Sequence, residues 1–305
     1  MPDSHTPASD PGLYRYWPYK DRPKLAWPGG RRLALWVAPN IEFYELRPPA
    51  NPARKAWPNP QPDVANYAYR DHGNRVGNWR LMEAMARHGV PGSVSLSVAM
   101  CDHFPDIIEA ANDLGWEFFS HGIYNTRYSY GMSEDQERAV IRDSVRTVRD
   151  ATGQRIAGYL APALTHTTRT LELIAEEGFS YTCDLFQDDQ PQPIRTRAGR
   201  LISMPYSLEV NDHYTLGVFG QTAEQYVDVL KRQMDQLLEE GGESGTVMCV
   251  PLHAYLIGRA HRMGAFEGFL AHVASLRDDV WITRGRDIAE HYLANAYDEA
   301  VTHGA

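Results

Sequence analysis

Residues 115–128 read GWEFFSHGIYNTRY, and this stretch decides how the fold is interpreted. It begins as an apolar, aromatic run suited to a buried strand and changes at Ser120-His121-Gly122 to small polar residues. His121 is therefore expected where a strand ends, the edge at which α/β enzymes carry their chemistry. A single histidine in that position can also be held by hydrogen bonds for structural reasons alone. The remainder of the chain decides between these two interpretations.

The same pattern recurs on both sides of this stretch. Apolar runs that end in polar residues alternate with segments whose apolar residues have helical spacing. Ser133 with Gln136 and Thr222 with Gln225 form capping boxes, which mark the starts of two helices. The alternation predicts an α/β barrel of parallel strands with its active site at their carboxyl ends. Besides the opening stretch, the predicted strands are 32–42, 93–98, 155–160, 179–183, 201–205, 246–252 and 280–283. The predicted helices are 78–88, 104–114, 133–153, 168–177, 222–240, 266–276 and 286–296.

The predicted barrel is a single domain, 30–297, with an extension at each end. Residues 1–29 are rich in proline and aromatic residues, which predicts an arm that packs on its own barrel or on a neighbouring subunit. Residues 298–305 are expected to form a C-terminal tail. Six prolines within 48–62 exclude a helix or central strand there and predict a long ordered loop or lid.

Composition restricts the classes of partner. The net charge of −9 and the scattered Lys and Arg residues give no support for binding nucleic acid or an anionic membrane. Three distant cysteines, with no CxxC spacing, argue against a disulfide framework and a zinc knuckle. There is no signal-peptide pattern and no run of eighteen apolar residues, so we expect a cytoplasmic protein that acts on a small molecule.

Polar residues collect after the predicted strands. Several such groups from separate strands indicate a pocket, although each one singly has a structural alternative such as an Asx turn or a helix cap. The loop after His253 is long enough to fold over this pocket, which makes Arg259 and His261 candidates for substrate contact. The strand-end residues are Asn40, Glu42, His121, Asn125, Asp184, Asp188, Asp189, Asn211, Asp212 and His253.

These residues resemble a known family. Asn40-Ile41-Glu42, Ser120-His121-Gly122 and the run from His253 to Arg259, in this order, are similar to motifs of the NodB-homology polysaccharide deacetylases. The closer likeness is to their intracellular branch, which contains metal-independent allantoinase and cyclic-imide hydrolases. The resemblance extends over about residues 20–295. It implies a distorted (β/α) barrel, hydrolysis of a carbon–nitrogen amide bond and, together with the aromatic arm, a homo-oligomer such as a tetramer.

The sequence departs from this family at its metal site. Metal-dependent members use an aspartate in the first motif and two histidines four residues apart in the second, whereas this chain has Asn40, Glu42, His121 and Asn125. A catalytic zinc normally has three protein ligands, so Glu42 and His121 alone would bind it poorly. If a divalent metal such as zinc is present, His253 is the obvious third ligand. The resemblance favours catalysis without a cofactor.

We therefore hypothesise a hydrolase of a small cyclic amide, imide or ureide. Glu42 is assigned as the base, His253 as the acid, and His121 as the residue that positions water or stabilises the oxyanion. Asn40, Asn125, Asn211, Asp212 and Arg259 are assigned to substrate binding. Two alternatives stay open: a metal-dependent N-deacetylase of a small acetylated sugar, and a barrel that binds a ligand without catalysis.

Overall fold

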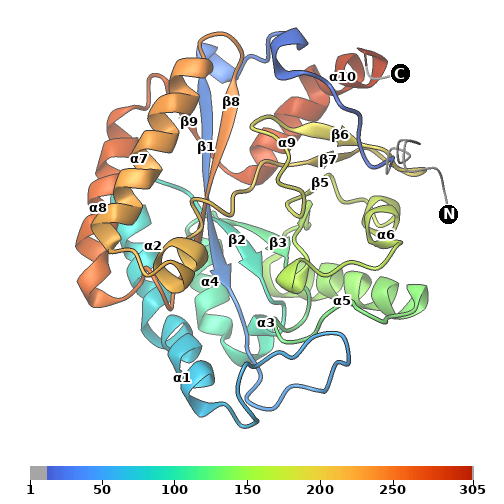
Figure 1. The fold of residues 1–305 in the computed structure, drawn as a ribbon, viewed down its shortest axis with the longest axis vertical. Coiled ribbons are helices and arrows are strands. Elements are labelled where there is room, and N and C mark those ends of the chain that lie inside the picture. The colour runs from blue at the N-terminus through green and yellow to red at the C-terminus, as the bar shows by residue number, and fades with distance from the viewer. Residues whose placement is uncertain (1–11, 304–305) are drawn as a thin grey trace, which may run out of the picture.

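The centre of the structure is a nine-stranded, curled sheet that forms an incomplete barrel (Figure 1). This computed structural model describes residues 12–303. The strand order is β6-β7-β5-β4-β3-β2-β1-β8, and β9 also pairs with β1. All neighbours are parallel except β6 and β7. The predicted distorted barrel is confirmed. The strands are β1 (Leu33–Ile41), β2 (Ser93–Leu96), β3 (Glu117–Ser120), β4 (Gly158–Tyr159), β5 (Tyr181–Thr182), β6 (Gln192–Ile194), β7 (Leu201–Ser203), β8 (Thr246–His253) and β9 (Val280–Ile282).

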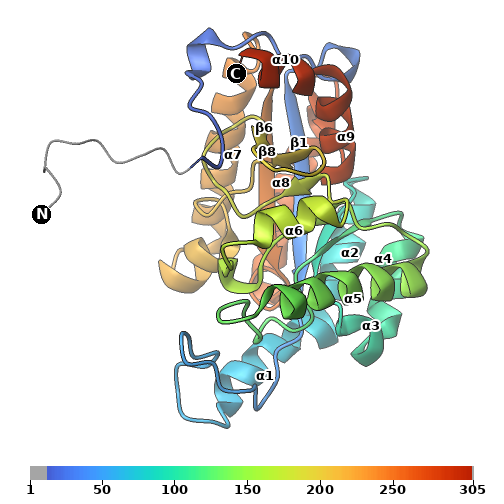
Figure 2. The same cartoon turned by 90° about the vertical axis from the view of Figure 1, so that its right-hand side faces the viewer.

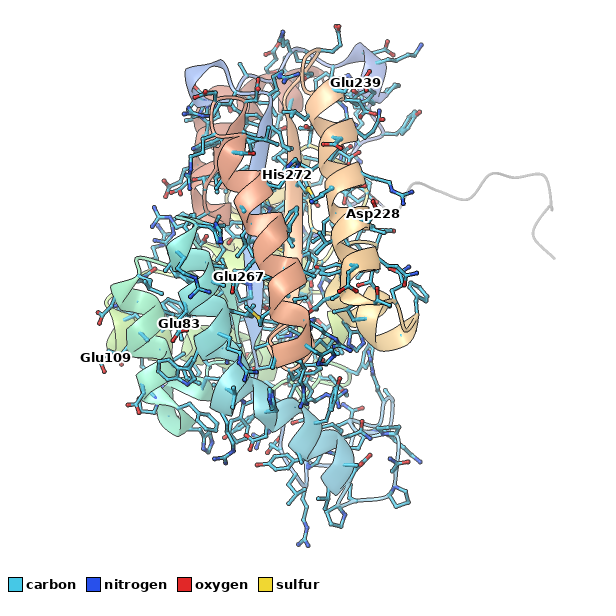
Figure 3. All side chains as sticks on the ribbon, turned by 90° about the vertical axis from the view of Figure 1, so that its left-hand side faces the viewer. Glu83, Glu109, Asp228, Glu239, Glu267 and His272 are labelled. Carbon is cyan, nitrogen blue, oxygen red and sulfur yellow. The ribbon has the colours of Figure 1, made fainter. Side chains whose placement is uncertain are left out.

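Helices cover the outer face of the sheet. Figures 1 and 2 show α7 and α8 beside β8, followed around the barrel by α2, α4, α5 and α6. Figure 3 shows the outer surface of this layer, where Glu83, Glu109 and Asp228 are exposed to solvent. No helix within residues 12–303 combines the length and the apolar content needed to cross a bilayer. The helices are α1 (Val64–His72), α2 (Asn78–Arg87), α3 (Met100–His103), α4 (Pro105–Asp113), α5 (Glu134–Thr152), α6 (Thr170–Glu176), α7 (Ala223–Glu240), α8 (Ala260–Ser275), α9 (Gly285–Asn295) and α10 (Tyr297–His303).

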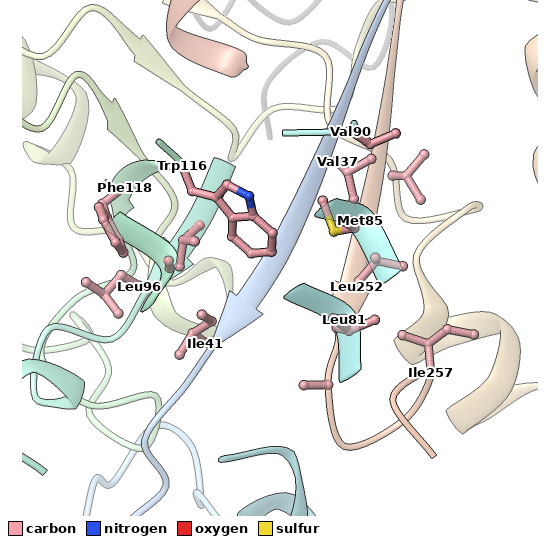
Figure 4. Packing of buried hydrophobic residues seen from close by; sticks show 14 of the residues in the cluster. Val37, Ile41, Leu81, Met85, Val90, Leu96, Trp116, Phe118, Leu252 and Ile257 are labelled. Atoms are coloured by element: carbon pink, nitrogen blue, oxygen red, sulfur yellow. The ribbon is translucent and has the colours of Figure 1, made fainter. Parts of the chain in front are cut away.

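Both faces of β1 are buried, which explains its continuous apolar sequence. Leu33, Leu35 and Val37 point outward into the core beneath the helices. Figure 4 shows part of this outer core around β1 and α2, including Val37 and Met85. Ala34, Trp36 and Ala38 belong to a second cluster inside the curl, which α9 also enters. The even-numbered residues of β1 therefore face the interior of the barrel.

The two predicted capping boxes are present. Ser133 accepts a hydrogen bond from the Gln136 backbone at the start of α5, and Thr222 does the same for Gln225 at the start of α7. The side chain of each glutamine reaches back to the backbone of its capping residue. The sequence therefore places the starts of these two helices correctly.

Several predicted boundaries need correction. The chain before the predicted helix 78–88 is also helical, because α1 continues into a π-helical segment, Gly73–Gly77. Helix α8 begins at Ala260 rather than near Phe266, so His261 is an exposed helical residue and not part of a loop. The predicted tail, 298–305, is helical as far as His303. Strand β6 lies at the edge of the sheet and pairs with β7 in the antiparallel direction. It has no counterpart among the predicted strands.

The extension at the N-terminus packs on its own barrel within the described residues. Trp27 is buried and its Nε1 donates to the Thr246 carbonyl at 2.9 Å. The Arg22 guanidinium donates to both carboxylate oxygens of Asp188 at 2.6 Å. Residues 1–11, the remainder of the predicted arm, lie outside the described residues. The Asp188 side chain therefore pairs with Arg22 of the arm and does not join the strand-end pocket.

Candidate active site

The alternation of side chains along the strands brings three predicted residues together. Glu42 continues the inward-facing series of β1 one step beyond the strand, after Ala38 and Asn40. His121 lies two residues after Phe119, which faces inward at the end of β3. His253 is the last residue of β8 and lies on the same, inward-facing side of that strand as Cys249. Since the strands are parallel, their carboxyl ends meet at one edge of the sheet.

Glu42 is the centre of the cluster. Its side chain is buried, and Oε1 accepts a hydrogen bond from Asn125 Nδ2 at 2.8 Å. The Tyr44 hydroxyl donates to Oε2 at 2.7 Å. Two imidazole nitrogens also face Oε1: His121 Nε2 at 3.2 Å and His253 Nε2 at 3.9 Å. One carboxylate therefore joins residues from three strands of the sheet.

Hydrogen bonds at Nδ1 fix the orientation of both histidines. His253 Nδ1 lies 2.7 Å from Asp212 Oδ1, and the same carboxylate accepts the backbone N–H of His253. His121 Nδ1 lies 3.0 Å from the Leu160 carbonyl. A carboxylate and a carbonyl can only accept, so Nδ1 carries a proton in each ring. Both Nε2 atoms are thereby directed at Glu42.

The charges in this cluster stabilise an ionised Glu42 beside a proton-carrying His253. Burial acts to raise the pKa of Glu42, but the positive charge of His253 and the hydrogen bond from His121 outweigh it and lower the pKa to about 2. Burial acts to lower the pKa of His253, but the carboxylates of Asp212 and Glu42 outweigh it, and the pKa is raised. The pair therefore places a proton acceptor, Glu42 Oε1, 3.9 Å from a proton donor, His253 Nε2.

The five predicted substrate-binding residues do not all join the cluster. Asn125 contacts Glu42, and Asp212 contacts His253 from a completely buried position, which makes Asp212 a positioning residue. Asn40 donates to the Leu252 carbonyl at 3.2 Å within the sheet. Asn211 accepts the His213 backbone N–H, and Arg259 donates to the carbonyls of Tyr69 and Tyr255. The contacts of these last three residues stabilise the backbone.

Asp184, another strand-end candidate, belongs to a separate network. Its carboxylate lies 2.8 Å from His166 Nε2 and also accepts from the Ala161 backbone N–H and the Thr182 hydroxyl. These contacts hold the loop after β4 in place. Neither Asp184 nor His166 has a recorded hydrogen bond to Glu42.

Three aromatic residues and one arginine beside the cluster were missed at the sequence level. The Arg70 guanidinium carbon lies 4.9 Å from the ring centre of Tyr44, 5.1 Å from that of Trp57 and 5.4 Å from that of Tyr255. Tyr44 is two residues beyond Glu42, so continuing the alternation of β1 could have identified it. Arg70 and Trp57 carry no such signal, because the proline-rich loop brings them in through tertiary folding.

The donors around Glu42 do not fit a resident metal. Asn125 directs its NH₂ group at Oε1, the oxygen that both histidines face, and an amide N–H cannot coordinate a cation. Within residues 12–303, no group of three or more His, Cys, Asp and Glu side chains is disposed to hold a metal ion. Asn125 thus brings an amide N–H, and not a ligand atom, to the carboxylate oxygen that both histidines face.

Comparison with known proteins assigns the family. The polysaccharide deacetylase family matches residues 65–182. The structure of a probable polysaccharide deacetylase from Pseudomonas aeruginosa PAO1 is 31% identical, with a TM-score of 0.80, over 90% of this chain and 95% of that one. The chain belongs to the polysaccharide deacetylase family. This confirms the predicted family resemblance.

The proteins to which this polysaccharide deacetylase family member is similar differ in what they act on. The crystal structure of PuuE allantoinase is 28% identical, with a TM-score of 0.78, and the match again covers 90% of this chain and 95% of that one. A Helicobacter pylori peptidoglycan deacetylase is 30% identical over 138 residues, which are 45% of this chain and 46% of that protein. Family membership supports a hydrolase of carbon–nitrogen bonds. It does not identify the substrate, which has to be inferred from the residues of the site.

Proposed function

We propose that this protein opens a small cyclic amide, imide or ureide by hydrolysis, without a resident metal. The observation that carries the proposal is the pairing at Glu42: its Oε1 receives an amide N–H from Asn125 and faces the proton-bearing His253 at 3.9 Å. A carboxylate base and an imidazolium acid are sufficient for acyl hydrolysis. The similarity to PuuE allantoinase supports a ring-shaped substrate.

In the proposed reaction, water attacks a ring carbonyl while Glu42 takes one of its protons. The carbonyl carbon becomes tetrahedral, and the carbon–nitrogen bond then breaks. His253 Nε2 gives its proton to the departing nitrogen, which becomes the neutral amine, amide or urea group of the product. The attacked carbon becomes a carboxylic acid, and the proton taken by Glu42 returns to His253. Asp212 supports this transfer because its contact with Nδ1 stabilises the imidazolium and holds the ring in place.

His121 and Tyr44 act on Glu42 in this mechanism. Each places a nitrogen or oxygen within 3.2 Å of the carboxylate, on Oε1 and Oε2 respectively. Together with Asn125 they fix the rotamer of the base, which keeps its lone pairs directed at the water position. They are positioning residues, and their removal is expected to reduce turnover less than removal of Glu42.

Replacing Glu42 by Gln tests the proposal. Glutamine preserves the shape of the side chain but cannot take a proton, so turnover should fall by roughly a hundredfold or more while the melting temperature changes little. Ring opening of allantoin, hydantoin and succinimide is measured by chromatography, and metal content by elemental analysis. The exposed Glu83→Gln on α2 is the matched control. A near-normal rate in Glu42→Gln removes Glu42 from the mechanism.

A second candidate is N-deacetylation of a small acetylated sugar with a divalent metal. The similarity to a peptidoglycan deacetylase supports it, and the Asn125 amide N–H directed at Glu42 weighs against the metal. Acetate release from acetylated amino sugars, measured beside ring opening, separates the two reactions. Turnover of either kind that is lost in His253→Ala also excludes a barrel that only binds a ligand.

A further inference from the structure

The proline-rich loop, 48–62, lies beyond the carboxyl end of β1 and contacts segments that follow two other strands (Figure 1). Asn51 Nδ2 donates to the Tyr130 carbonyl at 3.4 Å, in the segment after β3. Arg54 Nη1 donates to the Ala163 carbonyl at 2.9 Å, in the segment after β4. Strands β2 and β3 separate β1 from β4 in the sheet. The loop therefore spans the strand ends at which the acid–base cluster lies.

The acid–base residues are closed to solvent in this arrangement. The exposed fraction of the side chain is 4% for Glu42, 6% for His121 and 10% for His253. A substrate has to reach Glu42 and His253 together, so a segment at this end of the barrel must move to admit it. The two hydrogen bonds that hold the loop to its neighbours are exposed, and water can replace them at little cost. The proline-rich loop is thus suited to this movement.

One residue of the loop connects it to the proposed base. Trp57 is buried, and its Nε1 donates to the Glu45 carbonyl at 2.9 Å. The Trp57 ring centre lies 5.5 Å from that of Tyr44, whose hydroxyl donates to Glu42 Oε2 at 2.7 Å. The Arg70 guanidinium lies over both aromatic rings. Tyr44 is therefore packed between the loop and the carboxylate, and opening of the loop would remove one of its neighbours.

We propose that the proline-rich loop opens to admit the substrate, and that Trp57 couples closure of the loop to the position of Glu42. When the loop closes, Trp57 packs on Tyr44 and holds its hydroxyl against Oε2, so the base is aligned once the substrate is enclosed. Trp57 is a positioning residue, because it acts on Glu42 through Tyr44. This inference rests on the proposed catalytic role of Glu42 and requires no particular substrate.

Tethering the loop tests whether it opens. In Asn51→Cys/Tyr130→Cys, a short bis-methanethiosulfonate joins the two thiols, and a reducing agent releases them. The tether should lower turnover by about tenfold or more. It should also protect His121 and His253 from diethyl pyrocarbonate, as measured by peptide mass spectrometry, whereas the exposed His261 is modified as before. Reduction should restore both properties. Each single-cysteine variant, treated with the same reagent, is the control.

Replacing Trp57 tests the coupling. Burial acts to raise the pKa of Glu42, and the hydrogen bond from Tyr44 is one of the contacts that lower it. Trp57→Ala should weaken that contact and so raise the pKa. The acidic limb of kcat/KM should then move to higher pH, with kcat lowered by about tenfold. His121 and His253, the titratable imidazoles that face Glu42, lie outside the loop and are unchanged in this variant.

Three further variants make the shift of the acidic limb specific. Tyr44→Phe should move it in the same direction as Trp57→Ala, because the hydroxyl itself is lost. Trp57→Phe keeps an aromatic neighbour for Tyr44 and should restore most of the wild-type profile. The exposed Trp79→Ala on α2 is the matched control, with an unchanged profile expected. If Trp57→Ala does not fold, Trp57→Leu takes its place.

The outcomes separate the inference from the proposed function. Wild-type turnover in the tethered protein, or a loss of turnover without protection of the two histidines, would refute opening of the loop. An unmoved acidic limb in a folded Trp57 variant would refute the coupling. If none of the rings or acetylated sugars is hydrolysed, the catalytic role of Glu42 is refuted, and protection of the histidines by the tether still supports the opening.

Discussion

The carboxylate of Asp212 raises the pKa of His253, so the imidazole stays protonated to a higher pH. This carboxylate is completely buried, contacts Nδ1 of the imidazole and also accepts two backbone N–H groups, from His253 and Ile257. Because the pKa of His253 is raised above its usual value of 6.5, the pairing stabilises the fold fully below pH 6.5. That stabilisation is lost as the pH rises through the folded-state pKa.

Asp212→Asn should therefore move the pH profile of catalysis. Removing the negative charge lowers the pKa of His253, so the alkaline limb of kcat/KM should move to lower pH, with turnover reduced by roughly a hundredfold. A pH series of ring-opening rates, with circular dichroism at each pH, makes the measurement. A lower rate with an unmoved alkaline limb would show that Asp212 acts on folding alone and not on the proton of His253.

At the residue level, the predictable part of the site follows from alternation along strands. Glu42, His121 and His253 each extend an inward-facing series, so apolar runs with period two locate them without a structure. Arg70 is different, because it lies on α1 and reaches the site through packing on Tyr44, Tyr255 and Trp57, the last a residue of the proline-rich loop. A contact made by a long loop leaves no periodic signal in the sequence.

The π-helical segment Gly73–Gly77 positions both halves of the acid–base pair. Asn74 Nδ2 donates to the Glu42 carbonyl at 3.0 Å. A Cβ atom at Gly77 would lie only 2.1 Å from the Ala254 carbonyl oxygen, next to His253. The absence of a side chain at Gly77 therefore lets this segment pack directly on the turn that follows β8.

Gly77→Ala should destabilise the protein by about 2 kcal/mol, because backbone atoms must shift to admit the methyl group. Turnover should fall as well, since the shift displaces the residue adjacent to His253. Gly264→Ala is the control: it lies on α8 with nothing within 4 Å of a built Cβ, and alanine there should stabilise by about 0.5–1 kcal/mol. Urea unfolding compares the two. Equal stability of both variants would contradict the close packing at Gly77.

Helix starts were predictable where a side chain caps them. Ser133 and Thr222 accept backbone N–H groups at the starts of α5 and α7, so the sequence itself contains the signal. Helix α8 has Arg259 at its N-cap, with no side-chain hydrogen bond, and two glycines follow within the helix. Burial of Met263 and Phe266 determines its extent instead, and this depends on neighbours distant in sequence.

In the molecule as a whole, the N-terminal extension lies at the end of the barrel opposite the candidate site. In Figure 1 the dark blue segment lies near α10, whereas the loop between β1 and α1 lies at the other end of the sheet. Arg22 ties the extension to the barrel through Asp188, and it also donates to the Trp17 carbonyl at 2.8 Å. Both charged side chains are mostly buried, with exposed fractions of 9% and 13%.

Arg22→Met should loosen this extension without affecting catalysis. The change leaves Asp188 buried without its counter-charge, which costs about 3 kcal/mol when a buried pair loses one partner. Thermal unfolding should begin at lower temperature, and limited proteolysis should cut within 12–30 sooner. The ring-opening rate at 25 °C should stay within about twofold of the wild-type rate, because the extension lies at the opposite end of the barrel from the candidate site and distant sites act independently. Unchanged proteolysis would contradict the anchoring role.

At the scale of the whole molecule, the order of strands and helices predicted the barrel, because parallel strands need helical crossovers. The short antiparallel β6 was not predictable, since three residues provide too little pattern. The homo-oligomer stays a prediction, to be measured by light scattering.

The position of the two chain ends has a practical use. Residues 12–30 and α10 both lie at the end of the barrel remote from the catalytic cluster (Figures 1 and 2). A fusion partner or a linker to a solid support, joined directly to residue 12 or to His303, would start from that side. The immobilised protein would then present the mouth of its barrel to the solution, which suits a flow reactor or a sensor surface.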